Sequence, residues 1–369
     1  MAERVFGFGI VGCGMIAEFH VHAINELPNA RVTALQSRNP ANAARISAVV
    51  QGGAPTVFDD LTAMLASPAV DVVCVCTPSG AHLEPALAAA RAGKHVVVEK
   101  PLEITTARCD AIIQGCESHG VQLATIFPSR FSQANLDLKR AIDQGRFGTL
   151  TLGDTAVKWW RTQAYYDSGG WRGTWALDGG GALMNQAIHN VDLLQWLMGD
   201  IESLSAQVAT LAHDHIEVED TAVAAIKFRN GALGVIQAAT SAWPGLLKRV
   251  EIHGSTGSAR VEQDDVTLWN FADPRPEDQA IQEAVARASG FAAGASDPKG
   301  ISHQGHREQL ADFLDAIDQG RSPLIDGREG RKAVEIIRAI YASARSGRVI
   351  ELPLSNADES ILKPTDPPG

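Results

Sequence analysis

The chain has 369 residues, 45% of them hydrophobic, and a formal net charge of -11. Because Lys and Arg form no cluster along it, its field repels phosphate backbones and anionic lipid headgroups, and we expect neither nucleic acid nor a membrane surface as a partner. The length suits two domains of roughly 100–200 residues each.

The start of the chain and its cysteines favour a cytoplasmic protein. No basic start, apolar core and cleavage site precede the first strand-like segment, and no apolar stretch is long enough to cross a bilayer. The cysteines number five, and Cys74 and Cys76 lie in an apolar run, which favours buried thiols over disulfides. No Cys pair has zinc-site spacing and no H-x-x-x-H cluster occurs, so we expect no metal.

Residues 1–126 alternate short strand-like runs with Ala- and Leu-rich helical stretches. This alternation predicts an α/β domain of the Rossmann type, in which a parallel sheet carries helices on both faces. The 70–76 run is almost continuously apolar, as expected of a strand covered on both faces. The expected strands are 5–11, 31–37, 70–76, 95–99 and 121–125.

Residues 127–369 predict a second, α+β domain, because strands now follow one another. The expected strands are 149–161, 201–212, 221–229, 233–239 and 249–253. The hairpin-like turn at Arg229-Asn230-Gly231 indicates a mostly antiparallel sheet. Helices are expected at 182–198, 304–319 and 329–346. Segment 272–302 has poor periodicity, and we interpret it as a long excursion or a mobile lid.

The first strand runs into a G-x-G-x-x-A loop followed by a helix. In such a loop Gly12 allows the tight turn, Gly14 lets a pyrophosphate approach and Ala17 packs the helix on the strand. With a strand before it and further α/β units after it, the loop predicts a nicotinamide dinucleotide site. Its other expected contacts are Cys13, Met15 and Ile16.

The second strand ends without the acidic residue that binds the ribose 2′-hydroxyl in NAD-specific proteins. Ser37 and Arg38 stand there instead and suit a 2′-phosphate, which slightly favours NADP over NAD. The alternative is that Arg38 is a solvated residue at the start of a helix, and NAD is then equally acceptable.

Glu99-Lys100-Pro101 follows a buried strand at its carboxyl end, the edge where α/β sheets bind ligands. A lysine is often only a solvated surface group. Beside a nicotinamide, however, Lys100 could stabilise a developing alkoxide. The Lys100-Pro101 peptide bond is a candidate for the cis form.

A glycine run at 179–181 opens the helix expected at 182–198. Met184, Ile188 and Val191 form an apolar stripe on it, whereas Asn185, His189 and Asp192 follow an adjacent one. A lone helical histidine is usually structural. Set three residues before a carboxylate and behind a glycine run, His189 is a candidate general base.

Aromatic and cationic side chains gather just before that helix. They suit a carbohydrate or cyclitol, whose rings have apolar C–H faces and hydroxyl edges, and the cations could meet a carboxylate or phosphate. The alternative is a tryptophan cluster in the core. The candidates for substrate binding here are Lys158, Trp159, Arg161, Tyr166 and Trp171.

Taken together, the motifs resemble the glucose-fructose oxidoreductase / inositol dehydrogenase / MocA (Gfo/Idh/MocA) family over essentially the whole chain. They are the glycine loop with His20, Thr77-Pro-Ser-Gly-Ala-His82, Glu99-Lys-Pro101, Arg130, Gly180-Gly-x-x-x-Asn185-x-x-x-His189-x-x-Asp192 and Asp326-Gly-Arg-Glu.

The resemblance implies an open sheet in the second domain, with substrate between it and the nicotinamide. It implies Lys100 and His189 as the catalytic pair, assisted by residue 185. Many members carry Asp there, and Asn185 cannot accept a proton, so His189 is the expected base and Lys100 polarises the oxygen. It also adds expected cofactor contacts at Thr77, Pro78, Ser79, His82, Glu99 and Lys100, and substrate contacts at Arg130, Lys100, Asn185 and His189.

The predicted function is therefore an NAD(P)-dependent oxidoreductase acting on a secondary hydroxyl of a sugar, sugar derivative or inositol. The alternatives are an NAD-dependent redox-assisted glycosidase and a non-catalytic dinucleotide-binding regulator. An open sheet leaves a face that a monomer cannot cover, so we expect a homodimer or homotetramer.

Overall fold

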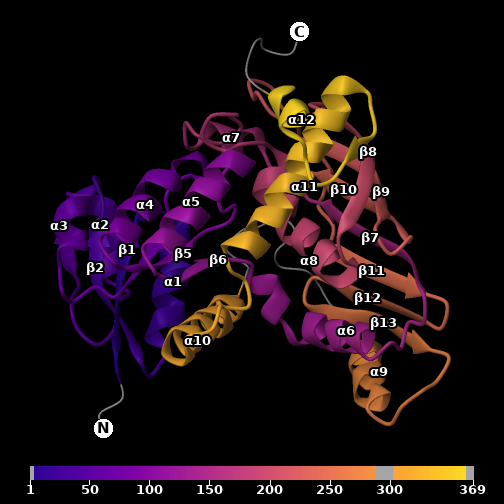
Figure 1. Ribbon diagram of the computed structural model, residues 1–369, viewed down its shortest axis with the longest axis horizontal. Coiled ribbons are helices and arrows are strands. Elements are labelled where there is room, and N and C mark those ends of the chain that lie inside the picture. Colours follow the sequence, from indigo (N-terminus) through magenta and orange to yellow (C-terminus); the bar gives the residue numbers. More distant parts are fainter. Residues whose placement is uncertain (1–3, 288–301, 363–369) are drawn as a thin grey trace. The chain divides into compact units, whose positions relative to one another are not determined.

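The computed structural model describes residues 4–287 and 302–362, which fall into two compact units. The first unit consists of Met1–Pro128 and Ser302–Val334, and the second of Ser129–Ile301 and Glu335–Gly369. Figure 1 follows the chain through both. The predicted domain 127–369 differs from the second unit, because the chain returns to the first unit with residues 302–334.

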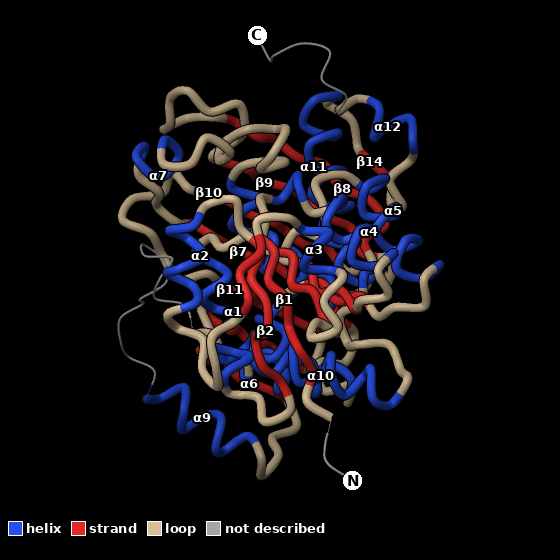
Figure 2. Tube along the Cα trace, turned by 90° about the vertical axis from the view of Figure 1, so that its left-hand side faces the viewer, coloured by secondary structure: helices blue, strands red, loops and turns tan. Residues whose placement is uncertain are grey.

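The first unit contains a six-stranded sheet in the order β3-β2-β1-β4-β5-β6, with every neighbouring pair parallel. This is the predicted Rossmann sheet, and β1 and β2 lie side by side in Figure 2. The strands are β1 (Phe6–Val11), β2 (Ala30–Gln36), β3 (Thr56–Phe58), β4 (Val72–Val75), β5 (His95–Val98) and β6 (Leu123–Thr125).

Helices pack on both faces of this sheet. One hydrophobic core joins β1 to α1, α2 and α10. Phe313 and Leu314 of α10 are buried in it, which explains why residues 302–334 belong to this unit. The elements are α1 (Met15–Asn25), α2 (Pro40–Ser47), α3 (Leu61–Leu65), η1 (Ser79–Ala81), α4 (Leu83–Arg91), α5 (Thr106–Ser118) and α10 (Gln304–Gln319).

The second unit contains an eight-stranded sheet in the order β13-β12-β11-β7-β10-β9-β8-β14. Only the β7–β10 pair is parallel, so the prediction of a mostly antiparallel sheet is confirmed. The strands are β7 (Leu150–Lys158), β8 (Ile201–Ala209), β9 (Thr221–Phe228), β10 (Leu233–Ala239), β11 (Arg249–Gly254), β12 (Gly257–Glu262), β13 (Asp265–Phe271) and β14 (Ile350–Glu351).

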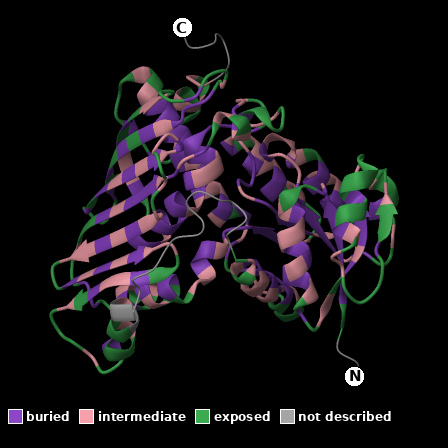
Figure 3. Ribbon diagram, turned by 180° about the vertical axis from the view of Figure 1, so that it is seen from behind, coloured by how far each residue is buried: buried purple, intermediate pink, exposed green. Residues whose placement is uncertain are grey.

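One face of this sheet is covered by helices. Burial alternates along β9, where Ala224 and Ile226 are buried and Val223 is 48% exposed, and Figure 3 shows the same stripes across the sheet. The other face is therefore the open one. The helical elements are η2 (Pro128–Phe131), α6 (Gln133–Asp143), α7 (Gln163–Asp167), η3 (Ala182–Ala187), α8 (Ile188–Met198), α11 (Gly327–Ser346), which starts in the first unit, and α12 (Asn356–Ser360).

Part of the segment expected to be irregular, 272–302, is helical. Helix α9 (Asp278–Arg287) is fixed at its start, where Arg146 donates to both carboxylate oxygens of Asp278 at 2.7 and 2.6 Å and Trp269 donates to one at 2.7 Å. The poor periodicity of this segment did not predict the helix at 278–287. Residues 288–301 of the same segment lie outside the described residues, and the long excursion or mobile lid over 272–302 stays a prediction.

All five cysteines are buried and unbridged, as predicted. Burial raises the pKa of the Cys76 thiol to about 11 and that of Cys116 to about 12, so these thiols are unreactive near neutral pH. Among the described helices, none combines the length and the apolar composition that crossing a membrane requires.

Candidate active site

In the first unit, the predicted cofactor residues meet at one edge of the sheet. Strands β1, β4 and β5 are adjacent and parallel, so the residues that follow them lie at the same edge. These residues are Gly12, Thr77 and Lys100. The strand order reverses between β1 and β4, and open α/β sheets bind ligands at that point.

The loop after β1 has the shape that a diphosphate needs. Gly12 has φ +90°, and a Cβ there would lie 2.8 Å from the Cys76 carbonyl oxygen, so only glycine fits. A Cβ on Gly14 would meet no atom within 4 Å, which leaves open space beside the start of α1. No side chain caps that helix, so its first N–H groups can bind an anion. Ala17 is fully buried, as the motif requires.

The residues after β2 form a compact turn. The Ser37 hydroxyl donates to the Asn39 carbonyl at 3.1 Å, and the Asn39 side chain caps α2. Arg38 is exposed. Arg45 of α2 donates to the carbonyl oxygens of Cys13 and Gly14 at 3.1 and 3.0 Å, and these hydrogen bonds fix the backbone of the glycine loop.

The loops after β4 and β5 are tied together by a buried histidine. The His82 ring nitrogens lie 2.9 Å from the carbonyl oxygens of Thr77 and Pro101. Thr77 also donates its hydroxyl to the Ala81 carbonyl at 2.9 Å. The Lys100-Pro101 bond is cis, as predicted. His82 thus supports the backbone on both sides of the expected cofactor position.

Glu99, an expected cofactor contact, lies in a buried cluster. Its carboxylate is 2.8 Å from His20 Nε2 and 3.4 Å from His306 Nε2, and it accepts the Lys100 backbone N–H at 3.1 Å. Burial alone would raise the pKa of Glu99, but the hydrogen bonds and charges of His20 and His306 bring it well below its usual range. Glu99 is therefore a carboxylate that fixes the backbone of Lys100.

We expect Glu99→Gln to lower the free energy of unfolding at pH 7 by about 3 kcal/mol, because one partner of a buried ion pair is lost. The pKa of Glu99 is lower in the folded protein, so its stabilisation is present above pH 4.5 and disappears as the pH falls further. Urea unfolding at pH 7 and pH 4 measures both effects.

The matched control is Glu84→Gln, since Glu84 is a largely exposed carboxylate in the same unit. That variant should unfold like the wild type at both pH values. An equal loss in both variants, or a Glu99→Gln effect that does not change between pH 7 and pH 4, would contradict the buried ion pair.

In the second unit, Asn185 lies in the π-helical turn η3, and His189 is in the first turn of α8. Such turns are frequent at functional sites. Asn185 donates Nδ2–H to Asp178 at 2.6 Å and accepts from Gln186 at 2.8 Å. These two hydrogen bonds hold the Asn185 side chain in one orientation.

The apolar stripe predicted on this helix is confirmed, because Met184, Ile188 and Val191 are buried.

Arg130 and Asp192 form a buried pair. Nε and Nη2 of Arg130 donate to the two carboxylate oxygens of Asp192 at 2.8 and 2.6 Å, and both residues are buried. The guanidinium also lies 5.4 Å from the Trp196 ring. Both residues belong to the motifs that resemble the family, and in the structure they form an ion pair with each other.

The substrate candidates before η3 form an aromatic and cationic group. Arg161 is buried, donates to Gln186 Oε1 at 3.0 Å and lies over the rings of Trp159 and Tyr165. Arg172 lies over Tyr165 and Trp171. Lys158 ends β7 and is partly exposed, whereas Trp159 and Tyr166 are buried. Trp159 and Tyr166 therefore support the group from the core side.

Other polar residues of these networks were not among the predicted site residues. Asp178 stands directly before the glycine run and Gln186 directly follows Asn185, so their positions are signals that sequence reasoning could have used. The others are recognisable only through the contacts that the folded chain makes. They are His213, Glu219, Asp220 and His306.

Two family models match the chain. One is described as an oxidoreductase family with an NAD-binding Rossmann fold and matches residues 6–127, and the other as a GFO/IDH/MocA C-terminal domain and matches residues 135–260. The myo-inositol 2-dehydrogenase of Thermotoga maritima is 26% identical over 93% of this chain and 98% of its own length.

Solved structures are also similar. The WlbA dehydrogenase of Bordetella pertussis, in complex with NADH and UDP-GlcNAcA, is 37% identical with a TM-score of 0.86, covering 96% of this chain and 100% of that one. The WlbA dehydrogenase of Chromobacterium violaceum, with the same two ligands, is 35% identical with a TM-score of 0.85, covering 96% of this chain and 98% of its own.

Proposed function

Because the chain belongs to the GFO/IDH/MocA oxidoreductase family, we propose that it is a nicotinamide-dependent dehydrogenase that oxidises a secondary hydroxyl of a sugar or cyclitol to a ketone. The observation that carries the proposal is made at one edge of the sheet in the first unit. There the open space beside Gly14, the uncapped start of α1 and Lys100 all follow parallel strands. The glycine loop is suited to bind the diphosphate of a dinucleotide, and the lysine is suited to bind the oxygen of an alcohol.

Three residues have separate roles in the proposed reaction. A bound nicotinamide supplies the acceptor for the hydride that leaves the substrate carbon. The Lys100 ammonium stabilises the negative charge that develops on the substrate oxygen. The His189 imidazole takes the hydroxyl proton as general base. Asn185, fixed by Asp178, positions the hydroxyl and takes no part in proton transfer.

We propose that the substrate is an anionic sugar. Arg161 and Arg172 place two cations among the aromatic rings of the second unit, Lys158 is a third cation close to Arg161 in sequence, and guanidinium groups suit carboxylates and phosphates. The two WlbA relatives, at 37% and 35% identity, contain UDP-GlcNAcA, a nucleotide sugar with a carboxylate. This compound is therefore the first substrate to test.

The test is a panel of UDP-GlcNAcA, neutral sugars, sugar acids and inositols, each offered with NAD and NADP. We expect absorbance at 340 nm to rise with UDP-GlcNAcA and little with neutral sugars. Oxidation of inositols alone would replace the anionic sugar with a cyclitol. Cleavage of a sugar without net cofactor reduction would indicate the redox-assisted glycosidase, and tight cofactor binding without any turnover would indicate the regulator.

For the cofactor, we propose a modest preference for NADP over NAD. It rests on the absence of an acidic side chain at residues 36–39 and on the exposed guanidinium of Arg38. We expect Arg38→Ala to weaken NADPH binding about tenfold or more, because a charge-assisted contact is lost, and to leave NADH binding unchanged. Fluorescence titration of the wild type and of Arg38→Ala with NADPH and with NADH measures the four affinities. Tighter binding of NADH than of NADPH by the wild type would contradict it.

We also propose a homodimer or homotetramer assembled through the open face of the second unit's sheet. Val223, Leu233 and Leu152 are 48%, 58% and 41% exposed on its strands. Apolar side chains in such positions favour association with a second copy. Light scattering at micromolar concentration distinguishes monomer, dimer and tetramer.

A further inference from the structure

We propose that Glu219 and Asp220 are a pair of positioning residues that set the two substrate-side segments of the second unit. They are consecutive residues just before β9, and their side chains bind different segments of the second unit. The proposal rests on the proposed function, because these segments carry the expected substrate and catalytic residues.

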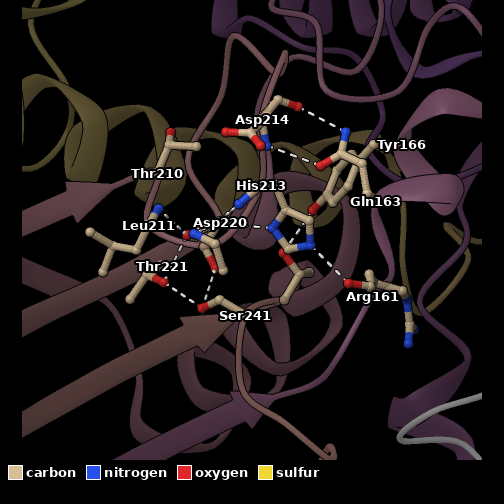
Figure 4. A network of polar contacts seen from close by, with 12 residues as sticks. Arg161, Gln163, Tyr166, Thr210, Leu211, His213, Asp214, Asp220, Thr221 and Ser241 are labelled. Carbon is tan, nitrogen blue, oxygen red and sulfur yellow. Dashed lines mark hydrogen bonds and ion pairs between the residues drawn. The ribbon is translucent and has the colours of Figure 1, made fainter.

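The Asp220 carboxylate accepts hydrogen bonds from the backbone of the loop that follows β8 (Figure 4). Its Oδ1 accepts the Leu211 N–H at 3.0 Å and the Thr221 hydroxyl at 2.9 Å. Its Oδ2 accepts the N–H groups of Ala212 and His213 at 2.8 and 3.2 Å, and Nδ1–H of His213 at 3.0 Å. Burial alone would raise the pKa of Asp220, but these donors bring it below its usual value. The group is a fully paired carboxylate.

His213 connects Asp220 to the backbone of Arg161. Its ring is held by Asp220 through Nδ1, and Nε2 lies 2.8 Å from the Arg161 carbonyl oxygen. The ring also packs edge-on against Tyr166, at 4.7 Å between centroids, and Tyr166 bonds to Thr240 at 2.7 Å. Figure 4 shows Asp220, His213 and Arg161 in this sequence. The carboxylate thereby fixes the backbone that presents Arg161.

Glu219 performs the same task for the turn before α8. Its Oε2 accepts the Gly181 N–H at 3.0 Å, and its Oε1 accepts the Leu183 N–H at 2.8 Å and the Tyr341 hydroxyl at 3.1 Å. The fit is tight, since a Cβ on Gly181 would lie 1.8 Å from the Glu219 carbonyl oxygen, and one on Gly180 would lie 2.1 Å from the Tyr341 hydroxyl. The side chain thus fixes the start of the segment with Asn185 and His189.

The kinetic test compares Asp220→Asn and Glu219→Gln with the wild type, using NAD and UDP-GlcNAcA. We expect Asp220→Asn to raise KM about tenfold or more with kcat little changed, and Glu219→Gln to lower kcat about tenfold or more with KM little changed, as misplaced groups do. Burial raises the pKa of Glu219 to about 7, so a neutral Gln mainly tests the lost N–H acceptor. Glu202→Gln is the control, because Glu202 is an exposed carboxylate paired with Lys227.

Hydrogen exchange by mass spectrometry tests the proposal without a substrate. Asp220→Asn should speed exchange in residues 211–213, whose N–H groups it binds, and in residues 159–166, but not in residues 179–187. Glu219→Gln should speed exchange in residues 179–187 but not in residues 159–166. If Asp220→Asn does not fold, His213→Phe keeps a ring, removes the bond to the Arg161 carbonyl and should loosen the same segment.

The outcomes separate the two proposals. Faster exchange in both segments for either variant, or in neither, overturns the positioning pair, as does an equal change of kcat and KM in both variants. A wild-type enzyme that does not oxidise UDP-GlcNAcA overturns the proposed substrate alone, since the exchange result still decides the role of Glu219 and Asp220.

Discussion

Replacing Lys100 with Ala should lower kcat about 100-fold or more and change the affinity for NADH far less. The expected loss is that of one preorganised donor to a developing oxyanion. The lysine follows β5 at the edge where the glycine loop lies, and Glu99 and His82 fix the backbone on either side of it. Steady-state kinetics and fluorescence titration with NADH measure the two quantities separately.

The matched control is Lys94→Ala, because Lys94 precedes β5 at the opposite edge of the same sheet. It should leave kcat unchanged. Near-wild-type turnover in Lys100→Ala would remove the lysine from the mechanism, and a parallel loss of NADH binding would make it a cofactor residue only.

Replacing His189 with Asn should lower kcat about 100- to 10,000-fold, the usual contribution of a general base. The variant should also lose the acidic limb of the pH dependence of kcat, because only the neutral imidazole can take a proton. His119→Asn, at the end of α5, is the control. A retained acidic limb with reduced kcat would show that another group titrates and that His189 only contacts the substrate.

The parallel sheet could be predicted because its strands are short, apolar and separated by helices. Val73 and Val96 are buried on both sides, so their strands are apolar without alternation. In contrast, β3 has three residues at a sheet edge and remains partly exposed, which leaves little pattern to recognise. β12 and β13 are not among the predicted strands, and the polar residues Arg260 and Asn270 interrupt their apolar sequence.

Which unit a helix belongs to is harder to predict from sequence than the helix itself. The sequence predicts a helix over 304–319, and α10 has these bounds. The spacing of Leu310, Phe313 and Leu314 indicates one buried face but does not show what covers it. Only the packing of Phe313 and Leu314 in the core around β1 assigns the helix to the first unit.

Some residues of the candidate site could likewise be predicted from local motifs, and others could not. Gly12, Lys100 and His189 stand in contiguous motifs, so spacing alone makes them candidates. Glu219 and Asp220 act mainly through backbone groups, those of Gly181 and Ala212 among them, and no sequence pattern marks such contacts. The π-helical form of η3 also escaped prediction, because the residues 182–198 have the periodicity of one continuous α-helix.

The most direct test of hydride transfer uses a sugar that the panel identifies, deuterated at its ring carbons. After reaction with unlabelled NAD or NADP, mass spectrometry of the reduced cofactor shows where its new hydrogen originated. We expect reduced cofactor that carries one deuterium and forms in equal amount to the oxidised sugar. Unlabelled reduced cofactor, or sugar conversion with no reduced cofactor, would contradict the account.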